Sequence, residues 1–139
     1  MNIDNTKIAI DVFNKLAKAY QDKFMDVSMY HNSLDVFCSF IKTENAEVLE
    51  LACGPGNITK YLLEKRNDFK LLGTDLAPNM IELAKINNPT AKFELMDCRA
   101  LNSITKYYDG ILCGFGLPYL SMDEAIQFIK DSSQRLNKN

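Results

Sequence analysis

The sequence predicts an α/β fold in which helices cover both faces of a doubly wound parallel sheet. Two observations predict it. Short apolar segments that suit buried strands start near residues 47, 69, 92 and 108, and stretches of helical periodicity alternate with them. The first of these strands also runs into a glycine turn with a helix directly behind it. Alternating strands and helices imply right-handed crossovers, so the expected strand order is 3-2-1-4.

Two amphipathic helices are expected ahead of the first strand. Apolar side chains recur there at positions i, i+3, i+4 and i+7, first at Phe13, Leu16, Ala17 and Tyr20 and then at Leu34, Phe37, Cys38 and Ile41. We therefore expect one domain over residues 1–139, in which residues 1–42 cover the ligand site and residues 43–139 form the βα units.

The first strand and its turn read Glu47-Val48-Leu49-Glu50-Leu51-Ala52-Cys53-Gly54-Pro55-Gly56. Because Gly54 and Gly56 lack Cβ atoms, the backbone can turn tightly and a ligand can approach it closely. The following helix offers unpaired N–H groups and a positive dipole end. A dinucleotide fingerprint would need a third glycine where Thr59 stands, so the turn predicts a nucleotide-like cofactor of another class.

The second strand, from Phe69, ends in Asp75, and Pro78 suits the first turn of the next helix. A carboxylate at this strand end can accept both hydroxyls of a ribose that lies across the sheet. Enzymes that bind NAD use the same device, so Asp75 alone does not separate the two cofactor classes.

The third and fourth strands complete the sheet. The segment Lys92–Met96 is followed by Asp97 and Cys98, and the fourth strand is expected over Tyr108–Phe115. Residues 102–107 are too polar to predict a helix between them. A capping box, Ser121-x-x-Glu124, starts the last helix, which carries one apolar face made by Met122, Ala125, Ile126 and Ile129.

The string Glu50-x-Ala52-x-Gly54-x-Gly56 resembles the first motif of class I S-adenosylmethionine-dependent methyltransferases. Glycine is commonest where Ala52 stands, so this position departs mildly from the pattern. The blocks around Asp75, Asp97 and the fourth strand resemble the later motifs of the same family in the same order. The resemblance covers roughly residues 46–135 and implies a Rossmann-like fold and methyl transfer from S-adenosyl-L-methionine.

The resemblance also assigns roles to residues. Glu50 would order donors around the methionine amine, and backbone carbonyls near Cys113 and Gly114 would face that amine. Asp97 would accept the adenine amine while the backbone N–H of Cys98 meets a ring nitrogen. Tyr20 and Tyr30 would contact the methionine end, although both could equally be ordinary tyrosines between helices. The expected cofactor-binding set is Tyr20, Tyr30, Glu50, Ala52, Gly54, Gly56, Asp75, Leu76, Met80, Asp97, Cys98, Cys113 and Gly114.

Two other functions stay open at this point. One is an NAD-type nucleotide-binding domain, which the residues Thr59 and Asp97-Cys98 disfavour. The other is a non-catalytic interaction module that retains the fold. For a methyltransferase, the loop Phe115–Leu120 would flank the acceptor, and its lack of an Asn-Pro-Pro-Tyr signature favours a small, fairly apolar molecule. No residue is identified as a general base.

The composition fits a cytoplasmic protein with a single core. The chain has 139 residues, 47% of them hydrophobic, and a net charge of −2, which gives no electrostatic footprint for nucleic acid. No transmembrane-length apolar run or signal-peptide pattern is found. The four cysteines lack metal-ligand or disulfide-framework spacing, so we expect packing residues and no metal site.

The end of the sequence differs from the family pattern. The family sheet normally has seven strands, and strands five to seven are expected to be missing here. Strand four would then be an edge, apolar and without lysine over residues 110–114, which invites pairing with a second chain. We therefore expect this chain either to self-associate through strand four or to be only marginally stable as a monomer. We also expect weak or absent methyl transfer.

Overall fold

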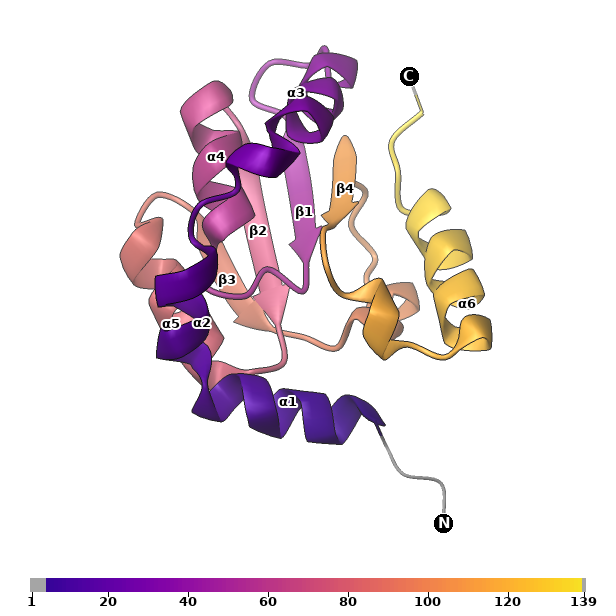
Figure 1. Ribbon diagram of the computed structural model, residues 1–139. Helices are drawn as coiled ribbons and strands as arrows, with labels where there is room; N and C mark the ends of the chain where they lie inside the picture. Colours follow the sequence, from indigo (N-terminus) through magenta and orange to yellow (C-terminus); the bar gives the residue numbers. More distant parts are fainter. Residues whose placement is uncertain (1–4, 139) are drawn as a thin grey trace.

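The computed structural model describes residues 5–138 and is built around a parallel four-stranded sheet (Figure 1). The strands are β1 (Glu47–Leu51), β2 (Lys70–Asp75), β3 (Lys92–Leu95) and β4 (Gly110–Cys113). Their order is β3-β2-β1-β4, with Val48 of β1 level with Leu71 of β2 and Gly110 of β4. The predicted fold class and strand order are confirmed, although β4 is shorter than the expected segment 108–115.

The helices connect and flank these strands. Before the sheet come α1 (Asn5–Lys15), α2 (Ala17–Phe24), the 3-10 turn η1 (Ser28–Tyr30) and α3 (His31–Phe40). The crossovers are α4 (Asn57–Lys65), α5 (Pro78–Asn87) and the 3-10 segment η2 (Cys98–Ser103). After β4 follow η3 (Leu117–Tyr119) and α6 (Met122–Ser133). Figure 1 shows α1 and α2 next to the arrowheads of the strands, where the crossovers begin.

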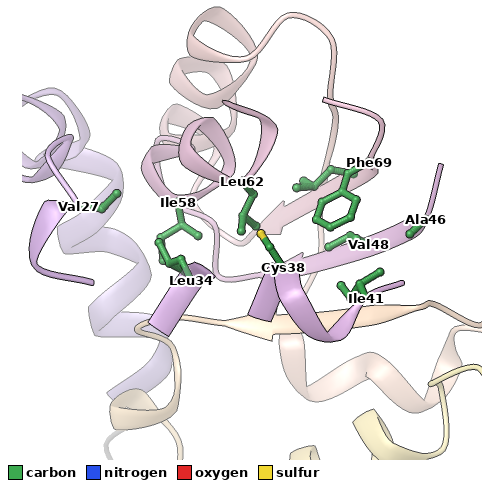
Figure 2. Close-up of a cluster of buried hydrophobic side chains, with 10 residues drawn as sticks. Val27, Leu34, Cys38, Ile41, Ala46, Val48, Ile58, Leu62 and Phe69 are labelled. Atoms are coloured by element: carbon green, nitrogen blue, oxygen red, sulfur yellow. The ribbon is translucent and has the colours of Figure 1, made fainter. Parts of the chain in front are cut away.

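One face of the sheet is covered by α3, α4 and α5. Val48 and Leu71 point to this face and pack with Leu34 and Cys38 of α3 and with Leu62 of α4 (Figure 2). A second group on the same face joins α5 to β3 through Ile81, Ala84 and Phe93. Since successive strand residues point to opposite sides, Leu49 and Leu51 belong to the other face.

The other face is covered by η2 and α6. Leu49 and Leu51 pack there against Leu101 of η2 and Phe128 of α6, all of them buried. The predicted capping box begins α6: the Ser121 hydroxyl accepts from the Glu124 N–H, and the Glu124 carboxylate accepts from the Ser121 N–H. This cap fixes the direction in which α6 leaves the loop after β4.

The structure corrects the expected helices at two places. The segment predicted as the first helix forms two helices, α1 and α2, because the chain bends at Leu16. Leu16, which was expected on the apolar face, is 55% exposed. On α6, the apolar face with Met122, Ile126 and Ile129 is exposed to solvent. Phe128 fills the space over β1 instead, so the inward face of α6 lies at Phe128 and Asp131.

The chain end lies beside the segment that leads into β4. The Tyr108 N–H donates to the carbonyl of Arg135, and the Asn137 N–H donates to the carbonyl of Tyr108, each at 2.8 Å. These bonds form a parallel bridge between Tyr108 and Leu136. Within residues 5–138, no strand pairs with the outer edge of β4 itself. No helix in that range combines the length and apolar character needed to cross a bilayer.

Candidate functional site

A cavity of about 370 Å³ lies over the carboxyl ends of the strands. Its floor consists of residues at or just after the ends of β1, β2 and β3, together with Met80 of α5. The walls are formed by α1, α2 and the η3 loop. The lining residues are Ala9, Ile10, Phe13, Tyr20, Phe24, Ala52, Gly54, Asp75, Leu76, Met80, Met96, Asp97, Cys98, Phe115, Gly116, Tyr119 and Leu120. In open α/β sheets ligands bind in this place, where the strand order reverses.

The turn after β1 has three residues in the left-handed backbone region: Ala52 and Gly54 at φ 55° and Gly56 at φ 78°. The two glycines serve different purposes. A Cβ on Gly54 would point into the cavity, where its nearest neighbour is Cε1 of Tyr20 at 3.9 Å. A Cβ on Gly56 would instead collide with the side chain of Asn88. Gly54 therefore keeps room for a ligand, whereas Gly56 permits close packing of α5 against the turn.

Asp75, at the end of β2, connects two parts of the cavity floor through hydrogen bonds. One of its carboxylate oxygens accepts the Gly54 N–H and the other accepts the Ala77 N–H, both at 2.9 Å. Burial raises the pKa of this carboxyl group, and the backbone N–H groups of Ala77 and Gly54 oppose that shift. The carboxylate is thus fixed between the glycine turn and the start of α5, where it faces the cavity as a hydrogen-bond acceptor.

Asp97, directly after β3, is a second acceptor on the cavity floor. Its carboxylate forms an ion pair with Arg99, whose Nη2 lies 2.7 Å from Oδ2. Burial by itself would raise the pKa of Asp97, but hydrogen bonds from Arg99 and its positive charge outweigh burial and lower that pKa. Asp97 is therefore ionised at neutral pH.

Glu50 does not line the cavity. It is buried within β1, with 1% of its surface exposed, and accepts a short hydrogen bond from the hydroxyl of Thr59 in α4. Burial raises the pKa of Glu50 to about 8, the Thr59 hydrogen bond opposes the shift, and the charge of Asp75 adds to it. Glu50 therefore links β1 to the first turn of α4.

Aromatic side chains form the wall opposite the acids. The ring of Phe13 meets Tyr20 and Tyr119 edge-on, at centroid distances of 5.8 and 5.3 Å. Tyr30 does not line the cavity, but its ring packs against Phe115, which does, at 5.1 Å. Burial raises the pKa of the Tyr20 hydroxyl, and the neighbouring Tyr119 and Asp75 act in the same direction.

The structure thus brings together part of the predicted set. The cavity is lined by Tyr20, Ala52, Gly54, Asp75, Leu76, Met80, Asp97 and Cys98. Glu50, Gly56, Cys113, Gly114 and Tyr30 lie behind this lining. The Ile58 side chain fills the space beside the Cα atom of Gly114, where another residue would have its Cβ. The Sγ atom of Cys113 lies in the same way beside Gly116. None of these five residues lines the cavity itself, although Tyr30 contacts a residue that does, Phe115.

Sequence reasoning missed several lining residues, namely Ala9, Ile10, Phe24, Met96 and, as a cavity residue, Phe13. The periodicity of the first helical segment indicated only that Phe13 faces inward. It could not show that the bend at Leu16 directs both helices toward the strand ends. Among residues 5–138 no group of acidic, histidine or cysteine side chains is suited to hold a metal ion.

Comparison with known proteins agrees with this geometry. Residues 48–139 match the family model described as "Methyltransferase domain". The chain is 35% identical over 81 residues to the putative methyltransferase 235L of Invertebrate iridescent virus 6. The aligned region covers 58% of this chain and 30% of the viral protein. It is 34% identical over 104 residues to a malonyl-[acyl-carrier protein] O-methyltransferase of Priestia megaterium. The aligned region covers 72% of this chain and 37% of that enzyme.

Solved structures share the fold. The magnesium protoporphyrin IX methyltransferase of Synechocystis, solved with bound S-adenosylmethionine, superposes with a TM-score of 0.74 at 18% identity. The match covers 99% of this chain and 74% of that one. The chain spans only about a third of the length of the two curated relatives above.

Proposed function

Since the chain belongs to the methyltransferase-domain family, we propose that its cavity binds S-adenosylmethionine for methyl transfer to a small-molecule acceptor. One observation carries the proposal: Gly54, Asp75 and Asp97, which stand at the carboxyl ends of three adjacent strands, line a single cavity. The dinucleotide alternative lacks both the third glycine and the support of the family match. The sulfonium group of the cofactor supplies an already activated methyl group, so the protein chiefly has to orient two molecules.

The residues present fit this cofactor. Asp75 and Asp97 offer two separate carboxylates, the first for ribose hydroxyls and the second for the adenine amine. Gly54 leaves open the space above the turn, and the lining between the two acids is apolar at Leu76 and Met80. Glu50 joins β1 to α4 through Thr59, and Gly56 permits close packing of α5 against the turn. We place the methionine end of the cofactor beside the end of β4, at Cys113 and Gly114.

The aromatic wall supports an uncharged or apolar acceptor. Phe13, Phe115 and Tyr119 line the cavity, and no lysine or arginine stands among its described lining residues. An acceptor with several negative charges would find no counter-ion there. The raised pKa of Tyr20 keeps its hydroxyl protonated, so Tyr20 serves as a hydrogen-bond donor and water-excluding group and not as a general base.

Asp75→Asn tests the proposal at its most informative contact. The amide keeps the size of the side chain and one acceptor for the backbone, but it loses the charge. We expect S-adenosylhomocysteine to bind about 10- to 100-fold more weakly, because charged hydrogen bonds contribute about 1.5–3 kcal/mol each. Isothermal titration calorimetry measures this, with exposed Asp123→Asn of α6 as the matched control. Equal affinity of Asp75→Asn and wild type would contradict the ribose assignment.

Two further parts of the proposal concern the whole chain. We propose a cytoplasmic location, which the four free cysteines support because they suit a reducing compartment. We also propose self-association through the outer edge of β4. Residues 110–114 are apolar, and among residues 5–138 only the preceding Tyr108 forms a backbone bridge on that side.

A further inference from the structure

The carboxylate of Asp97 is held by one residue, Arg99, from two directions. The backbone N–H of Arg99 donates to Oδ1 at 2.8 Å, so Asp97 caps the start of η2. The guanidinium of Arg99 then folds back on the same carboxylate, with Nε 3.1 and 3.0 Å from the two oxygens and Nη2 2.7 Å from Oδ2. This fork fixes both the position and the plane of the carboxylate.

Arg99 is itself oriented from a third element. Its Nη1 lies 3.2 Å from a carboxylate oxygen of Glu124, in the first turn of α6. The other oxygen of Glu124 accepts the Ser121 N–H of the capping box, so the Glu124 side chain is fixed as well. The packing of Phe128 against Leu101 holds α6 on η2. The chain Ser121, Glu124, Arg99 and Asp97 therefore links the loop after β4 to the cavity floor.

The contacts with Arg99 determine how many further hydrogen bonds the Asp97 carboxylate can accept. An ionised carboxylate has about four acceptor positions. Three hydrogens of Arg99 use the equivalent of three of them: the backbone N–H on Oδ1, one Nη2–H on Oδ2, and the Nε–H, which is shared between the two oxygens. One acceptor position is left for a donor in the cavity, and an acceptor group brought there would face a fixed negative charge.

We propose that Arg99, oriented by Glu124, is the positioning residue that makes Asp97 select a 6-aminopurine over a 6-oxopurine in the cofactor. This inference rests on the proposed function, because it assumes that the adenine ring reaches Asp97. The exocyclic amine of adenine supplies the donor that the remaining acceptor position requires. Hypoxanthine presents a carbonyl oxygen at the same place, which the fixed carboxylate repels. Without Arg99, Asp97 can rotate or take up a proton and then tolerate either base.

The test compares two ligands that differ at this one group, S-adenosyl-L-homocysteine and S-inosyl-L-homocysteine. Calorimetry gives the dissociation constant of each for the wild type, Arg99→Met, Arg99→Lys and Glu124→Gln. We expect the wild type to prefer the adenine ligand at least about tenfold and Arg99→Met to reduce this preference to within about threefold. Arg99→Lys keeps the charge but lacks the fork, so it should restore the preference only in part.

Two comparisons separate this role from general support of the fold. Glu124→Gln should reduce the preference in the same direction by a smaller factor, and Lys130→Met, which removes a cation from the exposed side of α6, should leave it unchanged. An Arg99→Met or Arg99→Lys protein that binds both ligands more weakly by one common factor would overturn the inference. A wild type that binds neither ligand would contradict the proposed function and the inference together, whereas an unaltered preference in folded Arg99 variants contradicts the inference alone.

Discussion

Glu50 brings a carboxyl group into the interior of a parallel sheet, where side chains are normally apolar. Its partner is the Thr59 hydroxyl, and the charge of Asp75 nearby further disfavours ionisation. Thr59 stands where a dinucleotide-binding protein would have its third glycine. The residue that argues against an NAD site is therefore also the one that donates the hydrogen bond to Glu50. The sequence allowed the first conclusion but not the second, because the contact depends on how α4 lies over β1.

The raised pKa of Glu50 predicts a pH-dependent stability. The folded-state pKa of about 8 exceeds the ordinary 4.5, so between these values the unfolded chain gives up a proton that the folded chain keeps. The free energy of unfolding should therefore fall as pH rises through this window and level off above about pH 8. The total decrease should be on the order of 5 kcal/mol. Urea unfolding at a series of pH values measures this loss.

The matched variants are Glu50→Gln, which cannot ionise, and Glu64→Gln at an exposed position of α4. Glu50→Gln should lack the decrease in stability between pH 5 and 8, whereas Glu64→Gln should keep the wild-type profile. The same profile in the wild type and Glu50→Gln would show that Glu50 does not cause the pH dependence.

The conformation of the glycine turn could be predicted from its residue types, but the separate roles of its two glycines could not. The pattern predicted a turn with unusual backbone angles, and Ala52 adopts φ 55° despite its Cβ, at a cost of about 1–2 kcal/mol. The pattern could not assign Gly54 to the ligand side and Gly56 to the α5 side. That division depends on Asn88, the residue after α5, whose side chain donates to the Gly56 carbonyl at 3.0 Å although it lies 32 residues further along the chain.

Among the elements, α2 is attached to the glycine turn by two buried or half-buried amides. Asn57 Nδ2 donates to the Phe24 carbonyl at the end of α2, at 2.9 Å. Asn87 Nδ2 donates to Gln21 Oε1 at 2.7 Å and to the Pro55 carbonyl at 2.8 Å. Because α2 carries Tyr20 and Phe24 into the cavity, these bonds determine where one wall stands relative to the cofactor turn.

Asn57→Asp tests this attachment. The variant replaces the donor by an oxygen that faces the Phe24 carbonyl, which leaves a buried acceptor unpaired at a cost of about 1–3 kcal/mol. We expect faster amide hydrogen exchange in residues 17–24, unchanged exchange in β1 and β2, and several-fold weaker binding of S-adenosylhomocysteine. Asn32→Asp, at an exposed position of α3, is the control. Uniformly faster exchange across the sheet would mean that Asn57 supports the whole fold and not α2 in particular.

Element types were predictable where a local signal specified them. The capping box at Ser121 and Glu124 correctly placed the start of α6, and Pro78 correctly placed the start of α5. The apolar stripe of α6 did not reveal which face of the helix is buried: Met122, Ile126 and Ile129 are exposed, and one large aromatic, Phe128, fills the space over β1. Helical periodicity identifies stripes, but the shape of the neighbouring layer decides which stripe is buried.

At the scale of the whole molecule, β4 has a free outer edge among the described residues, and α6 has an exposed apolar stripe. An exposed edge strand without lysine or proline invites pairing with another strand. We expect sedimentation velocity to show a mass that rises with protein concentration. Amides of residues 110–114 should exchange more slowly in the concentrated sample. A monomer at every concentration would contradict self-association through β4.

The strand order could be predicted from the sequence because four strand–helix signals in succession admit few right-handed topologies. The position of the acids at one edge of the sheet followed from that order, so Asp75 and Asp97 were correctly expected in the same cleft. Their partners were not predictable. Arg99 reaches Asp97 within two residues, yet its orientation depends on Glu124, twenty-five residues further along the chain.

The central claim is that this cavity is an S-adenosylmethionine site. Separate calorimetric titrations of the unmodified 139-residue chain with S-adenosylhomocysteine and with NAD test it most directly. The arrangement of Gly54, Asp75 and Asp97 predicts saturable binding of one S-adenosylhomocysteine per chain and no measurable binding of NAD under the same conditions. Binding of NAD in preference to S-adenosylhomocysteine, or binding of neither by a folded chain, would contradict the claim.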